Sequence, residues 1–132
     1  MEKLLETLTG LHRSKASQTV ASMEASDRER DDALSTLTGL VKAFSRVKEA
    51  SSKEAYDKLS KLFKNYAGLT SMSYEKETEA INHLLKEIKD TDYQTALSTL
   101  HLTTHVETLT KAQAQFEKAY KERLAEQKRQ GT

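Results

Sequence analysis

Two histidines near the end of the chain have a spacing that could serve metal binding. His101 and His105 are four residues apart and would share one face of a helix. A zinc protease of the H-E-x-x-H type needs a glutamate after the first histidine, but Leu102 stands there. His101 also falls in an expected link between helices. We therefore treat His101 and His105 as weak metal candidates and favour a structural or surface role for both.

The stretch Asp27-Arg-Glu-Arg30-Asp31 is the second group of interest. Ser26 and Glu29 have the S-x-x-E form of a capping box, and an acidic residue in a first turn complements the helix dipole. Arg30 would then pair with a neighbouring helix. This structural interpretation is the favoured one. The alternative is that Asp27, Arg30 and Asp31 form part of a partner-binding surface.

Motifs of known enzyme chemistry are missing from the sequence. A di-iron bundle needs paired Glu-x-x-His motifs, but Ala80 stands three residues before His83 and Leu102 three before His105. No glycine lies in a phosphate-binding G-x-G or G-K-[ST] context, and no serine lies in a G-x-S-x-G motif. We expect no enzymatic activity, no catalytic residues and no bound cofactor.

The charge balance bears on the class of partner. The chain has 21 basic and 20 acidic side chains and a formal net charge of +1. Such a balance produces no long-range field toward nucleic acid or a membrane surface. No apolar stretch is long enough to span a membrane. The absence of cysteine excludes disulfides and is compatible with a cytoplasmic protein. We expect a protein partner, with no nucleic acid and no membrane.

The composition favours helices. The 132 residues include no proline and four glycines, so there is little turn chemistry for a β-sheet protein. We predict an all-α fold, an antiparallel helical bundle of four to five main helices with one additional short helix. The whole chain, 1–132, is expected to be a single domain, with 125–132 as a frayed tail.

Apolar periodicity and capping signals place these helices along the chain. The predicted helices cover residues 1–25, 26–50, 51–67, 73–90, 93–100 and 104–129. Ser51, Ser73 and Thr104 are the expected N-caps, and Gly68 the expected residue after the third helix. No glycine or proline enforces a break before Ser26, so the first two helices could also be continuous. The last helix is expected to be the one along which the others pack.

The order of several motifs resembles an uncharacterised family of bacterial helical domains of unknown function. The motifs are Arg13-Ser14 through Thr19, the D-x-x-R-D pattern from Asp27, Tyr74-Glu-Lys-Glu77-Thr78, Leu102 to Leu109, Phe116, and Arg123 to Glu126. The chain is similar to the later part of a longer family domain. The resemblance implies a helical fold and no established activity. His101 stands where the family often has glycine.

These observations lead to a functional expectation. Several helices carry apolar stripes wide enough to leave surface for a partner. We expect a non-enzymatic helical scaffold or protein-interaction module that self-associates. The alternative, from a different class, is a metal- or small-ligand-binding bundle that uses His101, His105 and also His83.

Overall fold

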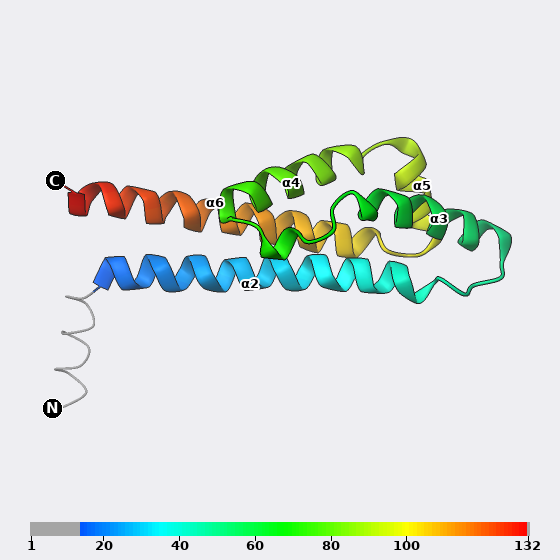
Figure 1. Ribbon diagram of the computed structural model, residues 1–132, viewed down its shortest axis with the longest axis horizontal. Helices are drawn as coiled ribbons and strands as arrows, with labels where there is room; N and C mark the ends of the chain where they lie inside the picture. Colours follow the sequence, from blue (N-terminus) through cyan, green and yellow to red (C-terminus); the bar gives the residue numbers. More distant parts are fainter. Residues whose placement is uncertain (1–13, 132) are drawn as a thin grey trace, which may run out of the picture.

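The computed structural model describes residues 14–131, and Figure 1 shows that this part of the chain is helical. Its elements are α2 (Ser14–Ala43), α3 (Ala50–Lys64), the short 3₁₀ helix η1 (Leu69–Ser71), α4 (Tyr74–Glu87), α5 (Thr91–Thr99) and α6 (Thr103–Gly131). The prediction of an all-α helical bundle is confirmed. Residues 1–13 of the first expected helix, 1–25, lie outside the described residues.

Helix α2 runs without a break through the position where we expected a second helix to begin. It is 30 residues long, and Ser26 and Glu29 both lie inside it. The predicted break at Ser26 is therefore wrong, and the continuous alternative is right. Next to Ser26, the Asp27 side chain pairs along the same helix, where its Oδ1 lies 3.1 Å from Arg30 Nε. The helix ends at Ala43, earlier than predicted.

Four of the expected helix boundaries can be compared with the observed ones. The prediction of Thr104 as an N-cap is wrong by a short step, because α6 begins at Thr103 and Thr104 lies inside it. Ser73 is the N-cap of α4, as predicted, and its hydroxyl accepts the backbone N–H of Lys76 at 3.3 Å. The N-cap of α3 is Glu49 and not Ser51, because its carboxylate accepts the backbone N–H groups of both Ser51 and Ser52. Gly68 has the expected left-handed backbone, with φ 75°, but it precedes η1, since α3 already ends at Lys64.

The long antiparallel pair of α2 and α6 forms the base of the fold. Figure 1 shows the two helices side by side, with α3, α4 and α5 lying over the right-hand part of the pair and its left end left uncovered by them. The core between these layers is apolar, and its fully buried members include Leu37, Leu59, Ile81, Leu84, Leu97 and Leu109. The base is thus two helices and not α6 alone. Helix α6 stays helical through residues 125–131, which we expected to fray.

A smaller apolar cluster lies where α4 begins. Met23 from α2 packs with Phe116 and Ala119 from α6, and Tyr74 and Tyr120 pack against this cluster. Beyond Ala119 the inward positions of α6 become polar, and Glu126 is buried. Leu124 is 44% exposed. The reason is geometric, because inward positions follow Ala119 by four and seven residues, and Leu124 lies one position off this spacing.

Candidate functional site

Arg30 is the centre of a polar network buried among three helices. It projects from the middle of α2 toward α4 and α6 and is 0% exposed. Its Nη1 donates to Thr78 Oγ1 at 2.7 Å and to Gln113 Oε1 at 3.0 Å. Its Nε donates to Asp27 Oδ1 at 3.1 Å, and its Nη2 to the Tyr74 carbonyl oxygen at 3.4 Å. All three guanidinium nitrogens therefore have partners, as a buried cation requires.

An aromatic ring forms one wall of this site. The guanidinium carbon of Arg30 lies 3.5 Å from the centroid of the Phe116 ring, a close cation–π contact. Tyr74 and Tyr120 hold the Phe116 ring in place, with centroid distances of 5.4 and 5.8 Å. The planar guanidinium can stack on the ring and donate at its edges at once, which a lysine ammonium cannot do.

Gln113 extends the network between α6 and α4. While its Oε1 accepts from Arg30, its Nε2 donates to the Thr78 carbonyl oxygen at 3.0 Å and to Asn82 Oδ1 at 3.2 Å. Asn82 in turn donates through Nδ2 to Glu117 Oε1 at 2.8 Å, back on α6. A continuous path of hydrogen bonds therefore joins α2, α4 and α6.

Three carboxyl groups lie beside the guanidinium. Glu77 on α4 is 1% exposed, and its Oε2 lies 3.5 Å from Arg30 Nε. Burial raises the pKa of Glu77 to about 8, with Asp31 adding to the rise and Arg30 opposing it. Burial and the charge of Asp31 also raise the pKa of Asp27. Burial therefore favours the protonated form of the Glu77 carboxyl group in the folded protein.

The same carboxyl groups have a spacing that could suit a cation. One oxygen from each of Asp27, Asp31 and Glu77 lies within 4.8 Å of the others. Oxygen ligands of this kind suit Mg²⁺ or Ca²⁺. However, the Arg30 guanidinium already lies 3.1 Å from Asp27 and 3.5 Å from Glu77, where it supplies the positive charge. We interpret the cluster as part of an arginine-centred network that holds the helices together.

The structure separates the three residues that we considered for a partner surface. Arg30 is fully buried and offers no surface to a partner, and it pairs with neighbouring helices as the structural interpretation expected. Asp27 and Asp31 are half-buried beside it, and a partner role for these two stays a prediction. Gln113 was missed by the sequence reasoning. The signal was its place between Leu109 and Phe116, on the inward face of α6.

The histidine candidates do not converge. His101 lies exposed in the link before α6, and His105 lies half-buried in the first turn of that helix. His83 is on α4, where its Nε2 is 2.8 Å from Glu87 Oε1. Within residues 14–131, the side chains grouped closely enough to bind a metal are the three carboxyl groups and include no histidine. His101 also has φ 59°, the left-handed backbone that glycine adopts most easily.

Comparison with known proteins gives one result. The model of a family described as "Family of unknown function (DUF6261)" matches residues 20–132, which include every member of the Arg30 network. No curated protein and no solved structure matches the chain. Across the described part of the chain, none of the helices combines the length and the apolar character needed to cross a membrane.

Proposed function

Because the chain belongs to this family of unknown function, we propose from its geometry that it is a non-enzymatic helical scaffold that associates with a second copy of itself. The observation that supports the proposal is that the shorter helices pack against only part of the long α2 and α6 pair. Figure 1 shows that α2 and α6 continue beyond the start of α4, without α3, α4 or α5 beside them. We call this part the stalk, residues 16–22 of α2 and 121–129 of α6.

The stalk has features that favour a protein partner. Leu124 is 44% exposed on it and offers an apolar side chain that a partner could cover. A shallow groove of about 350 Å³ runs over Ala16, Val20 and Ala21. Small side chains of this kind allow another helix to approach closely. An equivalent helix pair from a second copy would complete a four-helix bundle.

The charges at this groove are self-complementary. Its lining includes Glu24 and Arg123, one acidic and one basic residue. In a twofold dimer each residue of a contact is repeated on the partner, so that Arg123 of one copy can pair with Glu24 of the other.

Light scattering across a concentration series tests the proposal. The expected result is a mass that rises from monomer to dimer with concentration. Leu124→Glu places a charge on the stalk and is expected to weaken the dimer at least about tenfold. Met72→Glu is the matched control, because Met72 is also exposed, at 42%, but lies outside the stalk. A monomeric mass at every concentration would overturn self-association.

Two other expectations stay predictions. The alternative of a metal- or small-ligand-binding bundle would gain support if purified protein held stoichiometric metal that is lost in His105→Ala. The expected cytoplasmic location is tested by fractionating the cells that make the protein.

A further inference from the structure

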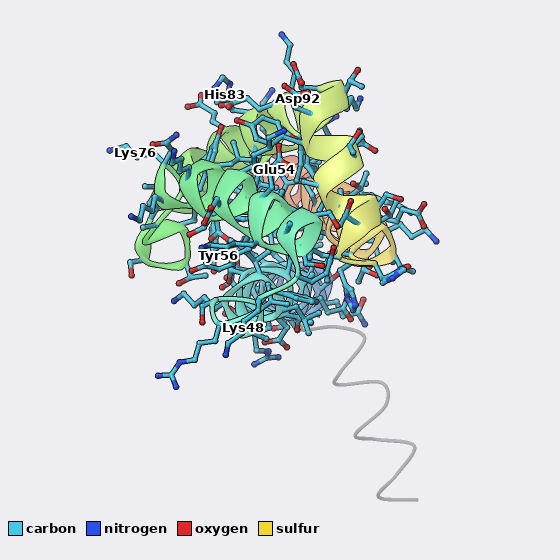
Figure 2. All side chains as sticks on the ribbon, turned by 90° about the vertical axis from the view of Figure 1, so that its right-hand side faces the viewer. Lys48, Glu54, Tyr56, Lys76, His83 and Asp92 are labelled. Atoms are coloured by element: carbon cyan, nitrogen blue, oxygen red, sulfur yellow. The ribbon has the colours of Figure 1, made fainter. Side chains whose placement is uncertain are left out.

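A groove at the other end of the molecule runs between α2 and the segment formed by α3 and η1. It encloses about 520 Å³. Its floor is apolar and is formed by Leu34 and Val41 from α2, Phe63 from α3, and Leu69 from η1. Tyr56 lies on the side of α3 that faces α2, as Figure 2 shows. The floor residues are themselves buried, so the groove is part of the packed structure and not a loose surface.

The walls of the groove are two antiparallel helical faces of similar length. Helix α2 contributes residues from Leu34 to Lys42, and α3 contributes residues from Tyr56 to Lys64. In each helix the lining positions recur at three- or four-residue spacing over about two turns. The open space is therefore long in the direction of the helix axes, about 12 Å for eight residues. This shape suits a third helix better than a compact small molecule.

The groove is lined by charges of one sign. Lys42 and Lys64 belong to the lining, and no aspartate or glutamate does. Neither lysine forms an ion pair among the described residues. The chain as a whole has nearly equal numbers of acidic and basic residues, so a lining with lysines alone is a local feature. The groove between α4, α5 and α6, of about 670 Å³, includes Glu107 among its lysines.

The two lysines lie toward opposite ends of the groove. Lys42 is in the last turn of α2 and Lys64 in the last turn of α3. Because α2 and α3 run in opposite directions (Figure 1), their last turns lie apart along the groove. An occupant that pairs with both lysines therefore needs two acidic groups separated by about two helical turns, with apolar groups between them.

We propose that this groove binds an acidic amphipathic helix of about two turns from a partner protein. Apolar side chains at positions i, i+3 or i+4, and i+7 of that helix fill the floor. Acidic side chains at its two ends pair with Lys42 and Lys64. The hydroxyl groups of Ser35, Thr38 and Ser60 along the walls can accept or donate further hydrogen bonds. This site is separate from the stalk, and its occupation does not depend on self-association.

A peptide-display selection on the full chain tests the proposal. The probe is a library of helical peptides of about 15 residues, in which charged and apolar positions are randomised on an alanine background. The expected winners carry apolar residues at helical spacing and an excess of acidic residues toward both ends. Their affinity for the full chain is then measured by fluorescence anisotropy.

Paired variants identify the binding surface. The double variant Lys42→Glu with Lys64→Glu is expected to weaken binding of the selected peptides at least about tenfold. The matched control is Lys86→Glu with Lys89→Glu, which changes two lysines of the other groove and is expected to leave binding unchanged. Circular dichroism confirms that each variant keeps its helices.

Three results would overturn the proposal. They are a selection that yields no binder, winners without an acidic excess, and winners that bind the Lys42 and Lys64 double variant as well as the original chain. The Leu124→Glu variant separates this site from the stalk. It is expected to bind the peptides normally, so a failed stalk proposal and a failed groove proposal give different results.

Discussion

Replacing Glu77 by glutamine tests whether the buried Glu77 carboxyl group keeps a proton in the folded protein. Glu77 is almost fully buried beside Asp31, and burial raises its pKa from 4.5 to about 8. In the unfolded chain the same carboxyl group ionises near its ordinary pKa. Between about pH 4.5 and pH 8, the folded protein therefore keeps a proton that the unfolded chain releases.

The sign and size of the effect follow from this difference. Each unit of difference between the folded and the unfolded pKa of Glu77 corresponds to about 1.4 kcal/mol. The free energy of unfolding therefore falls by on the order of 3 to 5 kcal/mol as the pH rises from 4.5 to 8. The stabilisation is complete below the unfolded pKa and is lost as the pH rises toward 8. Glutamine does not titrate, and its amide can donate to Asp31 as the protonated carboxyl group does. The stability of Glu77→Gln relative to the original chain should rise by about 3 kcal/mol from pH 5 to pH 8.

Urea denaturation followed by circular dichroism at several pH values measures this change. The control is Glu79→Gln, which makes the same substitution at an exposed position of the same helix. The free energy of unfolding of this control is expected to change with pH in the same way as that of the original chain. If the Glu77→Gln curve also runs parallel, Glu77 is ionised in the folded protein, and the inference of a retained proton is refuted.

Three further predictions concern stability and are measured by the same urea denaturation. Arg30→Ala is expected to cost about 3 to 5 kcal/mol, because it leaves Asp27, Thr78 and the buried Gln113 without their hydrogen-bond donor. Arg30→Lys is expected to cost about 2 kcal/mol, since lysine cannot reach all of these partners. A loss below about 1 kcal/mol for Arg30→Ala would contradict the network. Gly39→Ala and Gly68→Ala should change stability in opposite directions, because both sites have room for the added carbon but only Gly68 has a left-handed backbone. We expect Gly39→Ala, inside α2, to raise the free energy of unfolding by about 0.5 to 1 kcal/mol and Gly68→Ala to lower it by about 1 kcal/mol. A change of the same sign in both variants would refute this reasoning. His101→Gly should stabilise the fold by up to about 1 kcal/mol, because His101 holds φ 59°; a destabilised variant would show that the histidine side chain matters more than its backbone.

The fold class was predictable because helical periodicity depends on local spacing. Proline-free segments with apolar residues at three- and four-residue intervals gave the helices that the described residues contain. The helix boundaries were less predictable where several neighbouring residues could each serve as the N-cap. Glu49 caps α3 in place of Ser51 because a carboxylate can accept two backbone N–H groups, and the spacing of the serine motif cannot reveal that competition.

The prediction of a helix break at Ser26 was wrong for a related reason. An S-x-x-E pattern marks the start of a helix only where the preceding residues are not helical. In α2 the preceding residues are helical, and no glycine or proline interrupts the helix before Ser26. The sequence did indicate that Arg30 pairs with another helix. Its actual partners, Thr78 and Gln113, are 48 and 83 residues away, and side-chain periodicity carries no information about contacts between distant helices. Gln113 was recognisable as inward-facing, but not as a partner of Arg30.

The buried network also has a consequence for the alignment of the two long helices. Apolar faces alone would allow α2 and α6 to slide past each other by one turn, about 5.4 Å, with little loss of contact area. Such a slip would move Gln113 and Phe116 away from Arg30 and leave a buried charge without partners. The arginine thus selects one register of the helix pair over its neighbours, as a single polar residue does in a coiled coil.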